Sequence, residues 1–308
     1  MQTSNKQIQS SQTLSNNTKV TVNVHNETAP LKAVVLGIAT DCPEQPYANN
    51  PKVAEHIRNG TVPTEADLVA ELRTFEQVLL ENGVQVYRPE NMTNKNQIFT
   101  RDIGFVIGDQ FIQANMAKVN RQVEIEGVCY LKERIDAEKW LIPPEGATIE
   151  GGDVIVHNEF IFVGQGDRTN RAGYEFLRDK ISNKTVIPVS LRVTDKPRTN
   201  ILHLDCAFQP VGDGYVVIYE EGFLNPPEAL YDIFPENKRI SVTAKEMYDM
   251  YPNVFSIAPN KVVLLKEFTR LKKELHKRSI ETIEVEYEKI ARLGGLLRCS
   301  TLPLERGN

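Results

Sequence analysis

A unit of about fifty residues recurs along this chain and limits the folds that it can adopt. Each copy starts with a polar motif and continues into two short apolar runs about a turn, as in residues 104–112. From Asp102 to Glu150 and from Glu150 to His203, the motifs are 48 and 53 residues apart. A helix-like stretch and a further strand, such as residues 185–189, complete the unit. This period is typical of repeated supersecondary units arranged radially or in a stack.

The two ends of the chain fit the same unit. The strand at residues 31–37 precedes a helix that a Thr64–Asp67 capping box starts and a glycine after Asn82 ends. Residues 260–299 provide a strand and a helix for the last unit. We therefore predict five ββαβ-like units that fill residues 29–308 as one domain. If the polar motifs hold equivalent positions, five side chains converge on one axis: Asp102, Glu150, His203, Asp205 and Cys299.

The composition of residues 1–28 predicts a disordered tail. Ser, Thr, Asn and Gln dominate it, and its few valines leave room for a single edge strand. Such a segment has too little apolar surface to offset the entropy lost on ordering.

Charge and cysteine usage exclude several kinds of partner. The chain has 36 basic and 41 acidic residues and a net charge of −5, so we expect no nucleic acid and no membrane as a partner. Its four cysteines lie far apart without metal-ligand spacing, which predicts free thiols, a cytoplasmic location and no metal site. We expect no organic cofactor either. A homodimer is left open.

Cys299 is the first candidate for a reacting atom. It follows Gly294 and Gly295 and is adjacent to Arg298, and a nearby cation with close backbone donors lowers the pKa of a thiol. The alternative for a single cysteine is a buried structural thiol. By the same argument Cys206, next to Asp205, is expected to pack on a strand and not to react.

Three carboxylates around the axis change the chemistry that we expect of this thiol. They repel a thiolate and raise the pKa of the thiol, so the substrate must carry a cation that offsets them. A guanidinium is planar and permanently charged, and carboxylates can bind its five donors in pairs. The thiolate would attack its central carbon, and His203 would protonate the departing amine and then activate water.

The ordered motifs resemble those of the guanidino-group-modifying enzymes of the pentein fold, which include arginine deiminases, dimethylargininases and amidinotransferases. They are Asn96-x-x-Phe99-Thr100-Arg101-Asp102, Glu150-Gly151-Gly152-Asp153, His203-Leu204-Asp205 and Gly294-Gly295-x-x-Arg298-Cys299. The resemblance runs from about residue 31 to the C-terminus. It implies a five-bladed α/β propeller, in agreement with the five units, with residues 29–308 as the catalytic domain.

The resemblance also assigns roles to residues. It makes Cys299 the nucleophile, His203 the general acid and base, and Glu150 the third catalytic residue. Asp102 and Asp205 become a clamp for the guanidinium, and Arg121 and Arg168 become ligands of a substrate carboxylate. The alternative for these two arginines is a surface ion pair. Asn96 and Asp153, which belong to the same motifs, complete the predicted substrate-binding set.

We therefore predict a hydrolase of a guanidino compound, arginine or a methylarginine. An S-amidino intermediate on Cys299 would yield a ureido product, citrulline, with ammonia or an alkylamine. Glu150 favours the hydrolases, because the amidinotransferases carry aspartate there, whereas residues 102–115 resemble the amidinotransferases. The alternatives are an amidinotransferase that moves the amidino group from arginine to an amine such as glycine, and a propeller that binds a ligand without catalysis.

Overall fold

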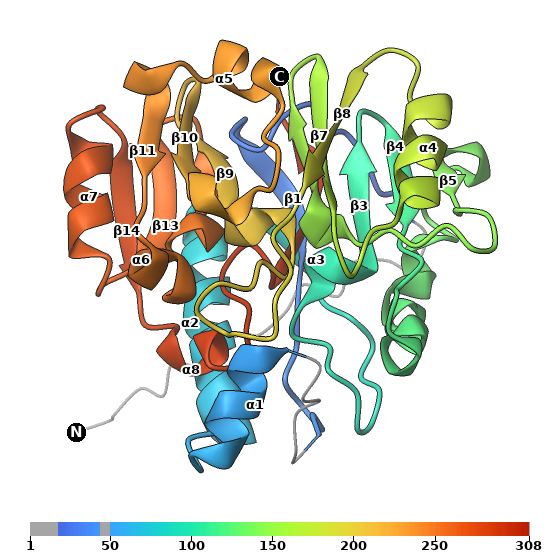
Figure 1. The fold of residues 1–308 in the computed structure, drawn as a ribbon. Helices are drawn as coiled ribbons and strands as arrows, with labels where there is room; N and C mark the ends of the chain where they lie inside the picture. The colour runs from blue at the N-terminus through green and yellow to red at the C-terminus, as the bar shows by residue number, and fades with distance from the viewer. Residues whose placement is uncertain (1–17, 44–49, 308) are drawn as a thin grey trace, which may run out of the picture.

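Five sheets of three strands each make up the core of the protein. A computed structural model describes residues 18–43 and 50–307, and in it the sheets stand side by side with helices on their outer flanks (Figure 1). The predicted five-bladed α/β propeller is confirmed. Among the described residues, no helix combines the length and the apolar character needed to cross a membrane.

Each complete blade is a hairpin, a crossover and a third strand. In the third blade, β6 (Val154–His157) runs antiparallel to β7 (Phe160–Gln165), and β8 (Thr185–Ser190) returns parallel to β7 after helix α4 (Arg171–Lys180). Parallel neighbours need such a crossover, so the ββαβ order follows from the pairing. The other hairpin blades are β3 (Gly104–Ile107), β4 (Gln110–Gln113) and β5 (Trp140–Leu141); β9 (Phe208–Val211), β10 (Tyr215–Ile218) and β11 (Arg239–Ser241); and β12 (Phe255–Ala258), β13 (Lys261–Leu265) and β14 (Glu281–Val285).

Crossovers and connections carry the remaining helices, which differ in length from blade to blade. They are α1 (Pro51–Arg58), α2 (Glu65–Glu81), α3 (Thr100–Ile103), α5 (Glu228–Ile233), α6 (Ala244–Tyr248), α7 (Thr269–His276) and α8 (Glu288–Ala291). The 3₁₀ helices are η1 (Val119–Leu131), η2 (Ala137–Lys139), η3 (Gly151–Asp153), η4 (Leu204–Cys206), η5 (Glu220–Gly222), η6 (Glu236–Lys238) and η7 (Tyr251–Asn253).

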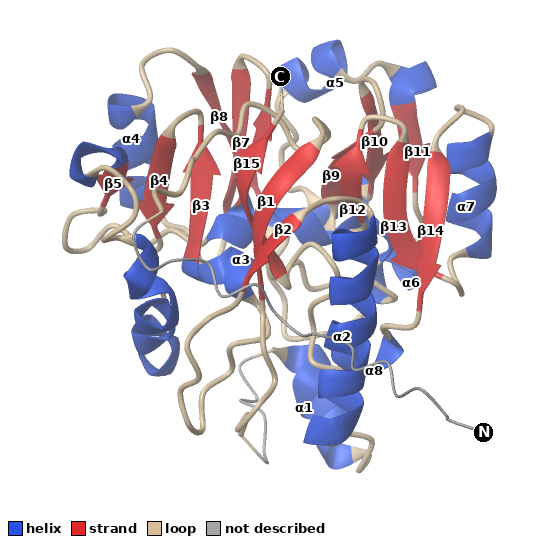
Figure 2. Ribbon diagram, turned by 180° about the vertical axis from the view of Figure 1, so that it is seen from behind, coloured by secondary structure: helices blue, strands red, loops and turns tan. Residues whose placement is uncertain are grey.

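The C-terminal strand closes the ring. β15 (Thr301–Arg306) pairs antiparallel with β1 (Leu31–Leu36), and β1 pairs parallel with β2 (Gln85–Tyr87), so the three strands lie together (Figure 2). The predicted first unit lacked this strand because the repeat was followed only along the sequence. Closure joins the two ends of the chain and fixes the residues just before β15 near the axis.

Helix α2 begins and ends where its sequence predicts. Its N-cap Thr64 accepts a hydrogen bond from the Asp67 amide at 3.2 Å, and the Asp67 carboxylate accepts one from the Thr64 amide at 3.0 Å. Each of these bonds satisfies an amide that the first turn leaves without a partner in the helix. The apolar face of α2, which includes Leu72 and Phe75, is buried in the main core cluster.

The prediction of a disordered tail to residue 28 is wrong for residues 18–28; residues 1–17 lie outside the described residues. Val20, Val22 and Val24 are buried, and the backbone of Asn23 exchanges hydrogen bonds with the edge of β15. This pairing gives the polar segment backbone hydrogen bonds, and its alternating valines provide the apolar burial that composition alone did not reveal. The ordered part of the chain therefore begins before residue 29.

Candidate active site

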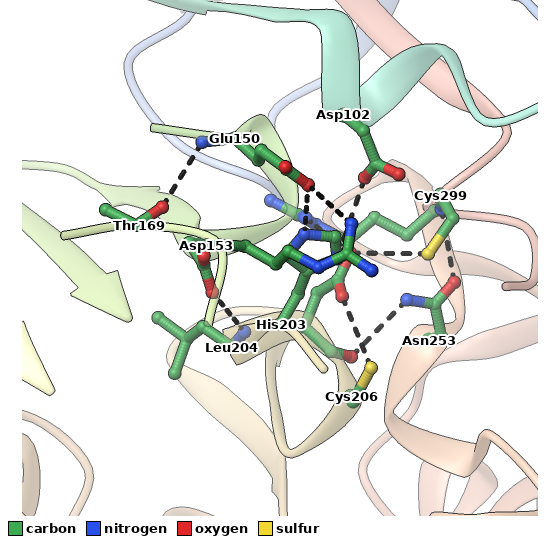
Figure 3. Close-up of polar contacts among 12 residues, drawn as sticks. Asp102, Glu150, Asp153, Thr169, His203, Leu204, Cys206, Asn253 and Cys299 are labelled. Atoms are coloured by element: carbon green, nitrogen blue, oxygen red, sulfur yellow. Dashed lines mark hydrogen bonds and ion pairs between the residues drawn. The ribbon is translucent and has the colours of Figure 1, made fainter. Parts of the chain in front are cut away.

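A short turn or helix precedes the first strand of every blade, and these turns meet at one end of the axis. The helices α3, η3, η4 and η7 stand before β3, β6, β9 and β12, and Cys299 stands two residues before β15. Because the blades repeat, these positions are equivalent and their polar side chains face each other (Figure 3). The structure thus brings Asp102, Glu150, His203 and Cys299 together from four blades.

His203 lies between two carboxylates. Its Nε2 is 2.8 Å from Oε2 of Glu150, and its Nδ1 is 3.7 Å from Oδ1 of Asp102. Burial opposes the charge on the imidazole, but Asp102, Asp153 and Glu150 together raise the pKa of His203 to about 9. Burial likewise opposes ionisation of Glu150, and the bond to His203 lowers the pKa of this carboxyl. At neutral pH the pair is therefore an imidazolium and a carboxylate, which makes His203 a proton donor.

The glycine pair after Glu150 leaves room for the imidazole. A Cβ on Gly152 would lie 2.7 Å from the ring of His203, closer than side chains approach each other. Glycine therefore allows η3 to pack directly against the imidazole. Asp153, at the end of η3, accepts a hydrogen bond from the Leu204 amide at 2.9 Å and fixes the turn that carries His203.

Asp102 has one oxygen in use and one open. Its Oδ2 accepts a hydrogen bond from Nη1 of Arg121 at 2.8 Å, whereas its buried Oδ1 accepts none from any described residue. Asp102 also lines a cavity of about 50 Å³, together with His203 and Cys299. A buried acceptor without a donor is costly, so Oδ1 is suited to a donor that a ligand brings.

Cys299 lies in this cavity wall, but its surroundings disfavour the thiolate. Its Sγ is 3.6 Å from Oδ2 of Asp205, and burial, Asp205 and Asp102 raise the pKa of the thiol well above its usual range. The expectation that Arg298 lowers this pKa is wrong, because the Arg298 guanidinium forms ion pairs with Glu27 and Asp205. In the protein without a ligand, the thiol is therefore protonated.

The structure does not place Asp205 in the predicted clamp. Its Oδ2 accepts a hydrogen bond from Nη1 of Arg298 at 2.9 Å, and it is not among the described residues that line the cavity. Asp205 instead contacts the thiol of Cys299 and raises its pKa. Cys206, on η4 and not on the predicted strand, is buried with its Sγ 3.8 Å from the other oxygen of Asp205.

The two predicted carboxylate-binding arginines are buried ion pairs, and the alternative of surface pairs is wrong. Arg121 forms a two-pronged pair with Glu124 besides its bond to Asp102. Nη1 of Arg168 is 3.5 Å from Oε2 of Glu150. Both arginines line the cavity, as does Asn96, whereas Asp153 is fully buried behind His203 and is not among the lining residues.

Asn253 is a residue of this site that the motifs did not reveal. Its Oδ1 accepts a hydrogen bond from the Cys299 amide at 3.1 Å, and its Nδ2 lies 3.4 Å from the Asp205 carbonyl oxygen (Figure 3). It therefore holds the backbone of Cys299 against η4. The repeat contained the information needed to find it, because the interval of about fifty residues, continued from His203, reaches residue 253.

Comparison with known proteins adds a family to this geometry. The model of the family described as N,N dimethylarginine dimethylhydrolase, eukaryotic, matches residues 44–306. The chain belongs to the dimethylarginine dimethylhydrolase family. It is 32% identical over 238 residues to the uncharacterized protein YkgA of Bacillus subtilis (strain 168). The matched region covers 76% of this chain and 79% of YkgA.

Other similarities of this dimethylarginine dimethylhydrolase-family chain cover part of its sequence or concern its fold. It is 30% identical over 123 residues to the N(G),N(G)-dimethylarginine dimethylaminohydrolase of Streptomyces coelicolor, over 40% of this chain and 45% of that protein. In fold it is similar to the amidinotransferase SxtG of Microseira wollei, with a TM-score of 0.76, 20% identity and coverage of 93% and 98%. The N-terminal domain of the cyanobacterial arginine dihydrolase ArgZ also has a TM-score of 0.76, with 19% identity over 89% and 98% of the chains.

Asp102, Glu150 and His203 of this family member lie close enough together to be tested as metal ligands. These groups already face cations, because His203 lies between the two carboxylates and Arg121 and Arg168 pair with them; only Oδ1 of Asp102 accepts no hydrogen bond from the described residues. A divalent cation would have to displace the imidazolium and sit next to two guanidinium groups. The residues therefore suit acid–base chemistry better than metal binding.

We predict that extended dialysis against a strong chelator leaves turnover unchanged, because Asp102, Glu150 and His203 would act without a bound metal ion. The measurement is the initial rate with the substrate before and after dialysis, with metal content followed in parallel. A loss of rate that one divalent ion restores would contradict this assignment of Asp102, Glu150 and His203.

Proposed function

We propose that this protein is a hydrolase of a guanidino compound and that Cys299 attacks the guanidinium carbon. The observation that carries the proposal is the arrangement of three groups around one cavity: the Cys299 thiol, the His203–Glu150 pair and the open oxygen of Asp102. The family match supports the same class of substrate.

A cationic substrate removes the obstacle to forming the thiolate. The guanidinium donates to Oδ1 of Asp102 and places a positive charge beside the thiol, which offsets the carboxylates that raise the thiol pKa. The thiol then releases its proton to water, and the thiolate sulfur forms a bond to the guanidinium carbon. The free energy of substrate binding thus offsets the cost of ionising the Cys299 thiol only when the correct cation is present.

His203 handles the protons of both half-reactions. As an imidazolium it gives its proton to the departing nitrogen, which leaves as ammonia or an alkylamine, and an S-amidino intermediate remains on Cys299. The neutral imidazole then takes a proton from water, which attacks the amidino carbon. The carbon–sulfur bond breaks, and the ureido product leaves with the thiolate restored. Glu150 holds the imidazole at 2.8 Å through both steps.

Relatives support a covalent intermediate and leave the acceptor of the amidino group open. ArgZ, an arginine dihydrolase, has been solved covalently bound to a reaction intermediate and, as a Cys-to-Ser variant, bound to its substrate. The likeness to SxtG concerns the fold alone, so water remains our proposed acceptor, with an amine such as glycine as the alternative. A propeller that only binds a ligand would not need Cys299, His203 and Glu150 in one place. A cytoplasmic location and a possible homodimer remain predictions.

The products distinguish these possibilities. We would incubate the protein with arginine or with N,N-dimethylarginine and measure citrulline, ammonia and dimethylamine, each with and without glycine. A hydrolase releases citrulline without glycine. Ornithine that forms only when glycine is present would instead establish a transferase, and binding without any product would leave the non-catalytic alternative.

Arg168 is proposed to recognise an α-carboxylate of the substrate. We predict that Arg168→Ala raises KM for arginine by about ten- to a hundredfold, since a charge-assisted contact contributes about 1.5 to 3 kcal/mol. Agmatine has no carboxylate, so its KM should not change.

The control for this substitution is Arg171→Ala, which removes an exposed ion pair with Glu175 and should leave both ligands unaffected. An equal rise in KM for arginine and agmatine in Arg168→Ala would show that the guanidinium of Arg168 supports Glu150, 3.5 Å away, and does not bind the substrate carboxylate.

A further inference from the structure

The amino-terminal segment inserts one carboxylate into the buried centre of the propeller. Glu27 is only 3% exposed, and its Oε1 lies 3.0 Å from Nη2 of Arg298, with Oε2 3.4 Å from Nε. The segment is held on both sides of Glu27, because Asn23 pairs with β15 and the Asn26 side chain accepts hydrogen bonds from the Thr28 and Ala29 amides. The position of the carboxylate is therefore fixed by backbone contacts.

Arg298 connects Glu27 to the candidate nucleophile. Its Nη2 also donates to the Val154 carbonyl at 2.9 Å, and its Nη1 donates to Oδ2 of Asp205 at 2.9 Å. The same oxygen of Asp205 is 3.6 Å from Sγ of Cys299. An unbroken row of contacts thus runs from Glu27 through Arg298 and Asp205 to the thiol.

Positive charge exceeds negative charge in the buried region around Glu27. Arg101 and Arg306 are buried near Glu27 besides Arg298, and Nη2 of Arg101 is 3.9 Å from Oε2 of Glu27. Burial opposes ionisation of Glu27, yet the three guanidinium groups lower the pKa of its carboxyl to about 2. Burial, with repulsion from Arg298, lowers the pKa of Arg101 to about 9. Glu27 therefore offsets an excess of positive charge next to Asp205.

We propose that Glu27 is a positioning residue for the reaction: by holding Arg298, it keeps Asp205 on the Cys299 thiol and preserves the negative charge that a cationic substrate must offset. Without the negative charge of Glu27, the positive charge of Arg298 is no longer partly neutralised, and it acts more strongly on Asp205 and on the thiol. The thiolate is then repelled less, and a guanidinium is attracted less. The inference rests on the proposed role of Cys299 as the nucleophile.

The charged groups around the thiol support the expected direction, a lower pKa of Cys299 when the Glu27 charge is lost. Asp205 and Cys206 of η4 and Asp102 of α3 raise its pKa electrostatically, and His203 lines the same cavity. The carboxylates dominate the effect of these groups on the thiol, so removal of one negative charge behind Arg298 lowers the pKa of Cys299 and weakens cation binding together.

The test is Glu27→Gln, which keeps the shape of the side chain and removes its charge. We expect Cys299 to react with iodoacetamide about three to ten times faster at a fixed pH near 8, since the thiolate fraction rises tenfold for each unit by which the pKa falls. Peptide mapping assigns the alkylated cysteine. In turnover, KM for the guanidino substrate should rise several-fold, with a smaller change in kcat.

The matched control is Glu71→Gln, which also neutralises a buried carboxylate. Glu71 accepts hydrogen bonds from the Lys289 and Ile290 amides at 2.9 Å, so its loss tests destabilisation without a contact to Arg298. An alkylation rate of Glu27→Gln equal to that of the wild type or of Glu71→Gln would overturn the inference.

Glu27→Asp provides a second test if Glu27→Gln does not fold. The shorter side chain keeps the charge but withdraws it from Arg298, so we expect a smaller increase in the alkylation rate, and no increase would overturn the inference. Alkylation needs neither substrate nor turnover. It therefore tests Glu27 even if the proposed hydrolase activity fails, and that activity is tested separately by its products.

Discussion

Replacement of Cys299 by serine is expected to reduce kcat by about four orders of magnitude or more while the substrate still binds. Loss of a covalent nucleophile removes the main route to product, and a serine hydroxyl stays protonated where a thiol can ionise. Binding survives because Oδ1 of Asp102 and the two cavity arginines are untouched. The measurements are the rate of citrulline formation and the dissociation constant by calorimetry.

Cys206→Ser is the control for this variant. Cys206 is also buried, and its Sγ is 3.8 Å from Asp205, yet it is not among the residues that line the cavity. We expect it to retain most of the activity. If Cys299→Ser kept its activity and Cys206→Ser lost it, the nucleophile would be Cys206.

Replacement of His203 by alanine has the second largest expected effect, a fall in kcat of about 10²- to 10⁴-fold, the usual contribution of a general acid–base group. The second half-reaction should suffer most, because the attacking water then lacks the neutral imidazole that takes its proton. An S-amidino adduct should therefore accumulate, and pre-steady-state kinetics would show a slow burst of amine release.

His157→Ala is a suitable control for loss of an imidazole. His157 ends β6, its ring centroid lies 4.8 Å from that of Phe234 with the ring planes tilted, and it is not among the residues that line the cavity. Its kcat should match that of the wild type. A His203→Ala variant with full activity would contradict the role of the imidazole.

The features that the sequence predicted are those carried by local patterns. A hairpin of two apolar runs and the capping box of Thr64 and Asp67 depend on neighbours in sequence, and both are present. The convergence of Asp102, Glu150, His203 and Cys299 followed from the repeat, because equivalent positions in blades face a common axis. Asn253 lies at the same position of its blade, but a single asparagine gives no motif of its own.

The features that the sequence missed depend on contacts between distant segments. Closure of the first blade joins β1 to β15, and Glu27 reaches Arg298 across 271 residues. Arg298 precedes Cys299 in the chain, but its guanidinium points to two carboxylates and not to the thiol, so adjacency predicted the wrong pKa. Asp205 was assigned to the substrate for a similar reason, since its partner Arg298 is 93 residues away.

The covalent intermediate is the central claim, and peptide mass mapping tests it most directly. His203→Ala would be mixed with the guanidino substrate, quenched in acid and digested. We predict an amidino adduct on the peptide that contains Cys299, formed in proportion to the amine released and lacking in the variant that also carries Cys299→Ser. An adduct on Cys206 would contradict it, and so would amine release at the full rate while Cys299 stays unmodified or after Cys299 is replaced by serine.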